Sequence, residues 1–140
     1  MAVSQISVFL ENKPGHLLHI LNVFETAGIN VRGFSMADTG DYGIARFVVD
    51  KPAQALEVLR AQSCAATESE VLCIRLPDKL GALAQVIRTF AAAGINVIYS
   101  YTLISSIIAI HTNNPSAAEA SLKAQLIELV SQDEMAAPVL

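Results

Sequence analysis

The sequence predicts an α+β fold in which one βαββαβ unit occurs twice in tandem. Residues 11–31 and 77–97 align at a constant offset of 66 positions, and nine of the 21 aligned residues are identical. Each segment carries apolar residues at helical spacing and lies between short runs rich in β-branched residues. A period of this length is too long for a solenoid repeat, so it indicates a duplicated domain.

The first strand and first helix of each half are predicted by pattern. Strands are expected at 3–10 and 71–76. In the loops that follow, Asn12 and Asp78 are expected to cap the helices, and Pro14 suits a first helical turn. Gly28 and Gly94 are expected just beyond the helix ends. The apolar face of each helix consists of Leu17, Ile20, Leu21 and Phe24 in the first half, and Leu83, Val86, Ile87 and Phe90 in the second.

The remaining elements also correspond between the halves. Second strands are expected at 29–37 and 95–104, and the third strands, 44–49 and 107–112, follow turns at 39–43 and at Ser105-Ser106. Second helices are expected to open at Asp50-Lys51-Pro52 and Asn113-Asn114-Pro115, and weak last strands are expected at 65–69 and 127–131. This is the ferredoxin-like order twice. It predicts domains at 1–69 and 70–140, with a boundary near 68–71 and a loose tail at 136–140.

Composition and charge exclude several classes of partner. The net charge of −4 argues against nucleic acid, which needs clustered Lys and Arg, and against a polybasic membrane anchor. No signal peptide and no apolar run long enough to span a bilayer is evident. Cys64 and Cys73 form no C-x-x-C motif, which indicates a reducing compartment. The expected location is the cytoplasm.

The strands of the second half are apolar on both sides. Ile107, Ile108, Ala109 and Ile110 are consecutive, and strands of this kind are usually covered on both faces. We therefore expect a homodimer in which a second chain covers the open sheet face. The alternative is that loops or the tail cover that face.

No motif for catalysis, metal binding or a cofactor is present. The three histidines lack companions at the usual metal-ligand spacings, and there is no P-loop and no recognisable nucleophile motif. Strands 44–49 and 107–112 also lack the aromatic pattern with which this fold binds RNA. We therefore expect a protein that is not an enzyme and uses no cofactor.

Two motifs carry a family resemblance. E-N-K-P-G-H-L and P-D-K-L-G-A-L, each followed after the helix by A-G-I-N-V, resemble the signature of the ACT domain, and the resemblance covers essentially the whole chain. It implies a stand-alone tandem ACT protein. In this family, paired domains place their antiparallel sheets side by side with the helices on one face. Many of them bind an amino acid at the interface and regulate enzymes of amino-acid metabolism.

The resemblance also implies which residues hold the ligand. The loop is most similar to the serine-sensing domain of phosphoglycerate dehydrogenase, whose two asparagines correspond to Asn12 and Asn30. Leu10 stands where that domain has a histidine, so a more apolar ligand is expected here. The free N–H groups of Gly15, His16 and Leu17 at a helix start suit a carboxylate.

Two unequal sites are expected at the domain interface. One combines loop 12–17 with Asn96 and Val97, and is favoured because Asp78 in the other loop repels a carboxylate. The second combines loop 78–83 with Asn30 and Val31. The full set of expected ligand contacts is Leu10, Asn12, Pro14, Gly15, His16, Leu17, Asn30, Val31, Asp78, Gly81, Ala82, Leu83, Asn96 and Val97.

Two interpretations of these residues stay open. They form an amino-acid sensor that acts allosterically on an enzyme, or they are helix caps and turn residues of a ligand-free interaction and dimerisation module.

Overall fold

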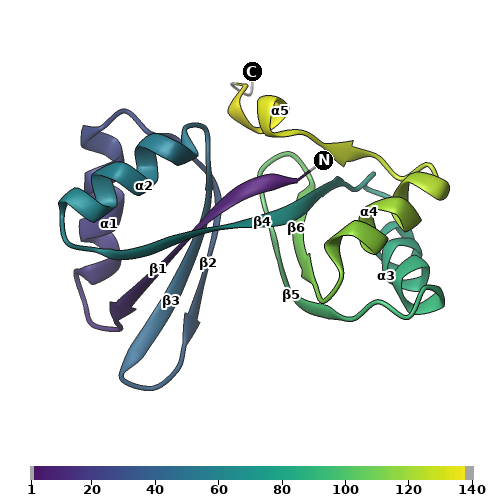
Figure 1. The fold of residues 1–140 in the computed structure, drawn as a ribbon, viewed down its shortest axis with the longest axis horizontal. Helices are drawn as coiled ribbons and strands as arrows, with labels where there is room; N and C mark the ends of the chain where they lie inside the picture. The colour runs from purple at the N-terminus through teal and green to yellow at the C-terminus, as the bar shows by residue number, and fades with distance from the viewer. Residues whose placement is uncertain (1, 138–140) are drawn as a thin grey trace. The chain divides into compact units, whose positions relative to one another are not determined.

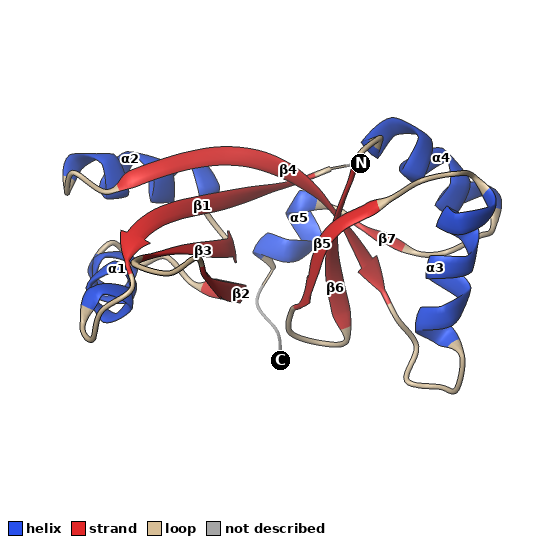
Figure 2. Ribbon diagram, turned by 90° about the horizontal axis from the view of Figure 1, so that it is seen from below, coloured by secondary structure: helices blue, strands red, loops and turns tan. Residues whose placement is uncertain are grey.

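The computed structural model describes residues 2–137, which form two compact units. The first unit comprises Ser4–Ser69 and the segment beginning at Met135, and the second comprises Glu70–Glu134 and the N-terminal residues up to Val3. Each is a sheet with two helices on one face, as Figure 1 shows and Figure 2 colours by element type. The expected α+β class and the repeated ferredoxin-like order are confirmed.

The first unit has the strand order β2-β3-β1-β4. β3 pairs antiparallel with both β1 and β2, so Phe47 lies opposite Ile6 on one side and Phe34 on the other. The elements of this unit are β1 (Val3–Glu11), α1 (His16–Thr26), β2 (Val31–Asp38), β3 (Tyr42–Val49), α2 (Pro52–Ala61) and the first part of β4 (Ala65–Arg75).

The second unit repeats this order as β7-β4-β6-β5. Its last strand is shorter than the expected 127–131, since only Leu129 and Val130 pair with β4. Its elements are the rest of β4, α3 (Ala82–Ala92), β5 (Val97–Thr102), β6 (Ile107–Thr112), α4 (Pro115–Ala124), β7 (Leu129–Val130) and the start of α5 (Gln132–Ala136).

The two strands expected at 65–69 and 71–76 are instead one continuous strand, β4. The segment A-A-T-E-S-E-V-L-C-I-R contains no glycine or proline to interrupt it. A short helix, α5, was not expected. It begins where Ser131 and Glu134 bond reciprocally as a capping box. Of the predicted tail at 136–140, residues 138–140 lie outside the described part of the chain.

Both cores are built on the helical faces that periodicity predicted. In the first unit the buried Phe24 of α1 meets Phe47 of β3 edge to face, with ring centroids 5.1 Å apart. In the second unit Phe90, the repeat equivalent of Phe24, is equally buried. Burying each such side chain contributes about 2–3 kcal/mol, so these faces hold the helices on their sheets.

The predicted apolar face of α3 is only partly buried. Leu83 and Ile87 are 53% and 42% exposed, whereas their equivalents in α1 pack against the first core. The difference lies in the edge strand. β2 carries Phe34 and Met36, and β5 has Ser100 and Thr102 at the equivalent positions. These smaller polar side chains do not cover the helix.

The open sheet face of the second unit is already buried in a single chain. Cys73, Ile107 and Ala109 are at most 5% exposed, and Tyr99 and Tyr101 are half-buried. The apolar character of these strands therefore does not by itself require a second subunit.

Two equivalent turns follow the second helices. Ser63 and Leu126 both have left-handed backbone conformations, with φ of 60° and 56°. Their N–H groups bond back to the carbonyls of Arg60 and Lys123 and so end the helices. Glycine is the usual residue at such a position. Leu126, however, is a leucine that is also 93% exposed, so it gains nothing from burial.

Replacing Leu126 with glycine is expected to stabilise the protein. Relief of the left-handed strain outweighs the added chain entropy by about 0.5–1 kcal/mol. Ser63→Gly is the matched change in the first unit and should act in the same direction. Urea unfolding measures both variants. A loss of stability in Leu126→Gly contradicts this interpretation of the turn.

The two free thiols should differ in reactivity. Burial raises the pKa of Cys73 to about 12, so its thiolate is scarce at neutral pH, while Cys64 is half-buried. Titration with Ellman's reagent is expected to modify Cys64 in the folded protein and Cys73 only after denaturation. Equal rates for both thiols in the folded state contradict the burial of Cys73.

Candidate functional site

The loop before α1 is organised differently from the sequence prediction. The N-cap of α1 is Gly15, in a left-handed conformation with φ of 91°, and no side chain caps the helix. Asn12 is therefore not the cap, and Pro14 precedes the helix. Because glycine turns the chain straight into His16, Asn12 lies too far from the helix start. Its Nδ2 donates instead to Oδ1 of Asp38 at 3.1 Å.

Only part of the predicted carboxylate cradle is free. The N–H of His16 donates to the carbonyl of Lys13 at 3.2 Å, so this donor is already used. The first helical bond runs from His19 to Gly15, which leaves the N–H of Leu17 without an intrahelical partner. The adjacent Lys13 forms an ion pair with Glu11 at 3.0 Å and so lowers the pKa of that carboxyl group.

The second loop repeats this geometry. Gly81 is the N-cap of α3 with φ of 85°, so Asp78 is not the cap either. The N–H of Ala82 donates to Lys79, as that of His16 does to Lys13. Asp78 is exposed, Ala82 is buried and Leu83 is exposed.

The strand starts are held by residues that the sequence analysis did not assign to the site. The backbone N–H of Asn30 donates to Oδ1 of Asp50 at 2.8 Å. The N–H of Asn96 donates to Oδ1 of Asn113 at 3.0 Å in the same way. Both asparagine side chains are exposed, so their amides can reach a ligand. In the sequence, the residues that hold these strand starts can be recognised as the polar residue two positions before the proline of each second helix.

Val31 and Val97 are less exposed than the asparagines beside them. Both are half-buried and pack against the core of their own unit. Their side chains therefore support the sheet.

Arg32 is the functional candidate that sequence reasoning missed. It follows Asn30 and Val31 at an irregularity in the β2–β3 pairing, and it is only 5% exposed. Its buried Nε has no hydrogen-bond partner among residues 2–137. Leaving a buried N–H group without an acceptor costs about 1–3 kcal/mol. Its repeat equivalent is Ile98, and periodicity alone gives no signal for it.

Each unit brings some expected site residues to a cavity of its own. In the first unit, Leu10 and His16 line a cavity of about 480 Å³ together with His19 and Cys64. In the second unit, the residues lining a cavity of about 260 Å³ include Asp78, Ala82, Leu83 and Thr102.

Within 2–137, no three His, Cys, Asp or Glu side chains gather closely enough to hold a metal ion. In that part of the chain, none of the helices has the length and apolarity needed to cross a bilayer.

Comparison with known proteins supplies the family. A family model described as an ACT domain pair matches residues 1–138. No curated protein matches the chain. A crystal structure of a protein from Bacteroides thetaiotaomicron is similar, with 29% identity, a TM-score of 0.91 and coverage of 97% of this chain and 96% of the other.

Two further solved structures share the fold. The ligand-free regulatory subunit of aspartate kinase from Thermus thermophilus has 20% identity and a TM-score of 0.65, covering 88% of this chain and 90% of its own. Aspartokinase III of E. coli, in complex with lysine and aspartate, has 15% identity and a TM-score of 0.54, covering 88% of this chain and 30% of its own. With both sequence motifs present, the protein described here belongs to the family of ACT domain pairs.

Proposed function

We propose that this ACT domain pair is a regulatory sensor of a small amino acid and that Arg32 binds the ligand's carboxylate. A regulatory role agrees with the family and with the aspartate kinase regulatory subunit that shares its fold. The observation that carries the finer proposal is the buried guanidinium of Arg32 without a described partner, next to Asn30 and Val31. A ligand carboxylate can neutralise the charge of the guanidinium and also accept hydrogen bonds from its N–H groups.

The proposal changes the preference between the two expected sites. The sequence favours loop 12–17 with Asn96 and Val97, but Asn12 is engaged with Asp38. Arg32 favours the start of β2, where the exposed amide of Asn30 is a second polar contact. We take residues 1–69 and 70–140 as the two ACT domains. We expect the protein to act in the cytoplasm on an enzyme of amino-acid metabolism.

A thermal-shift screen of the twenty amino acids tests ligand binding. An amino acid present at 100 times its Kd adds ~2.7 kcal/mol of stability, which is readily detected. Asn30→Ala and Asn96→Ala are matched variants at equivalent positions. Asn30→Ala is expected to weaken binding about tenfold, which corresponds to one lost hydrogen bond of 1.4 kcal/mol. An absence of any shift with all twenty amino acids overturns the sensor function.

Arg32→Met tests the carboxylate anchor. In the absence of ligand the variant should be as stable as the wild type or more stable, because a buried unpaired charge is replaced by an apolar chain of similar length. Ligand binding should be lost. Arg46→Met, on the neighbouring strand β3, serves as the control and should retain binding. If Arg32→Met binds the ligand normally, Arg32 is not the anchor.

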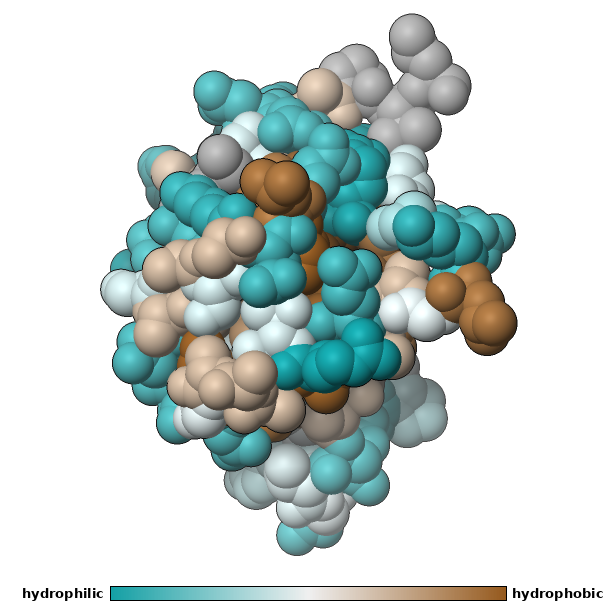
Figure 3. All heavy atoms as spheres, turned by 90° about the vertical axis from the view of Figure 1, so that its right-hand side faces the viewer, coloured by the Kyte–Doolittle hydropathy of each residue, from teal (hydrophilic) through white to brown (hydrophobic). Residues whose placement is uncertain are grey.

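A second candidate function is a ligand-free dimerisation module. It is favoured by the uncovered apolar side chains of the second unit, namely Leu80, Leu83, Ile87 and Ile98. Figure 3 looks onto the side where this unit lies in Figure 1 and shows apolar residues exposed among hydrophilic ones. Exposed apolar surface often marks protein interfaces.

Sedimentation equilibrium separates the two functions. A homodimer formed through these residues should dissociate in the double variant Leu83→Ser/Ile87→Ser and should be indifferent to amino acids. Leu18→Ser, at an exposed leucine of α1, is the matched control. A monomeric wild-type protein excludes the dimerisation module.

A further inference from the structure

The second unit contains a further cavity of about 500 Å³, which shares Leu76, Pro77, Lys79 and Ala82 with the loop cavity but extends to the turn after α4. It lies between the end of β4, the first turns of α3 and the turn from α4 to β7. All of its lining residues fall within Glu70–Glu134, so one unit forms it alone. Its volume is in the range of small-molecule sites. Its walls are formed by Arg75, Leu76, Pro77, Lys79, Ala82, Gln85, Val86, Ser105, Gln125, Leu126, Ile127 and Glu128.

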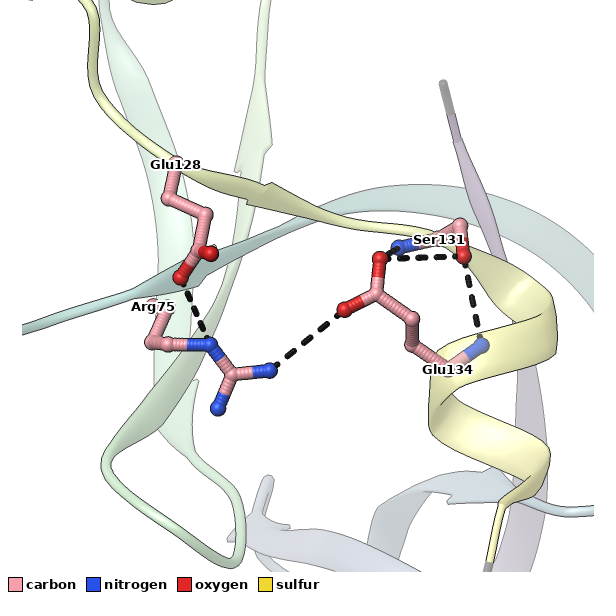
Figure 4. A network of polar contacts seen from close by, with 4 residues as sticks. All are labelled: Arg75, Glu128, Ser131 and Glu134. Carbon is pink, nitrogen blue, oxygen red and sulfur yellow. Dashed lines mark hydrogen bonds and ion pairs between the residues drawn. The ribbon is translucent and has the colours of Figure 1, made fainter.

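One wall of this cavity carries a positioned cation. The Nε of Arg75 forms an ion pair with Glu128, with 2.6 Å between the atoms, and its Nη2 lies 3.5 Å from Glu134. Glu134 is itself held by Ser131 at the start of α5, as Figure 4 shows. The guanidinium is thus fixed from two sides, while its remaining N–H groups are left to a further acceptor. Lys79 adds a second positive charge to the lining.

The lining also contains apolar residues, one of which has no evident role in the fold. Leu126 holds a left-handed backbone conformation and is 93% exposed at the rim. A leucine at this position is unfavourable for both the backbone and the exposed side chain. Val86 and Ile127 continue the apolar surface into the cavity. A molecule with an apolar body would cover all three.

Comparison with the first unit shows that the fold alone does not place a cation and an apolar rim at this cavity. It has a cavity of similar size, about 480 Å³, at the equivalent place. There, Phe9 and Ala65 occupy the positions of Arg75 and Glu128, and Ser63 that of Leu126. The duplicated backbone therefore supplies the hollow in both units, but only the second unit combines a fixed cation with an apolar rim.

We propose that this cavity of the second unit binds a small carboxylate with an apolar body. The carboxylate is bound by Arg75 and Lys79, and the apolar body lies against Val86, Leu126 and Ile127. Glu128, on the same wall as Arg75, leaves a place for an ammonium group. The ligand is thus an apolar amino acid or the corresponding simple acid. The site is independent of Arg32 and Asn30 in the other unit.

The test uses the ¹⁵N-labelled full chain titrated separately with 4-methylpentanoate, L-leucine and acetate. Either of the first two should shift the amides of residues 82–86 and 125–128. Acetate, which lacks the apolar body, should bind at least tenfold more weakly. Stronger shifts with L-leucine identify an amino acid as the ligand, and stronger shifts with 4-methylpentanoate identify a simple acid. No shift of residues 125–128 with any of these probes overturns the proposal.

Variants separate this site from the fold and from the proposed sensor site. Leu126→Gly, which keeps the left-handed turn, should weaken binding of 4-methylpentanoate or L-leucine here about tenfold, as expected for an uncovered leucine side chain. Ser63→Gly, the same change in the equivalent turn, should leave binding unaltered. Arg32→Met should also leave these shifts unaltered, so either site can fail without the other. If Leu126→Gly binds as tightly as the wild type, the apolar wall is wrongly assigned and the proposal falls.

Discussion

The structure depends on the burial of one helical face against one face of each small sheet. Units of about 70 residues have little surface to bury, so a few large side chains dominate their stability. Phe24 and Phe90 occupy equivalent positions and are both almost completely buried. They fix the depth at which α1 and α3 sit on their strands. The glycine that precedes each helix then sets the path of the loop, and with it the placement of every candidate ligand contact.

The two units share the same backbone arrangement, but they differ in the residues around it. The left-handed glycines on either side of α1 and α3 and the A-G-I-N-V strand starts are the same in both units, and each strand start is held by the side-chain oxygen of an Asp or an Asn. The charged and edge positions differ. Arg32 corresponds to Ile98, and Arg75 corresponds to Phe9. The two units therefore share a backbone but offer different chemistry, which is how one duplicated fold comes to carry unlike sites.

The two units differ in how the charge of an arginine is compensated. Arg75 is half-exposed and held by two carboxylates, so its desolvation is compensated within its own unit. Arg32 is almost fully buried, and no described acceptor meets its Nε. A group in this state costs free energy in the unliganded protein. Binding an anion would remove that cost, so ligand binding at Arg32 would raise the stability of the folded protein.

The sequence alone determined the four longer helices and the repeated strand order, because the periodicities of both halves are long and mutually consistent, but it did not determine the continuity of β4 or the presence of α5. It also located the glycines beyond α1 and α3, whose left-handed conformation only glycine adopts readily. The ACT motifs are visible in the sequence, and they locate the loops and strand starts that surround the candidate site.

Only the tertiary structure decided which groups are free to act. Asn12 has the chemistry of a helix cap, but the left-handed Gly15 begins the helix too far along the chain, so Asn12 bonds to Asp38 instead. Leu83 has the periodicity of a core residue, but its burial depends on which side chains the edge strand β5 supplies. Arg32 carries no motif, and its missing partner is visible only once the packing is known. Caps, exposure and unpaired charge depend on contacts between residues distant in sequence, which local pattern does not encode.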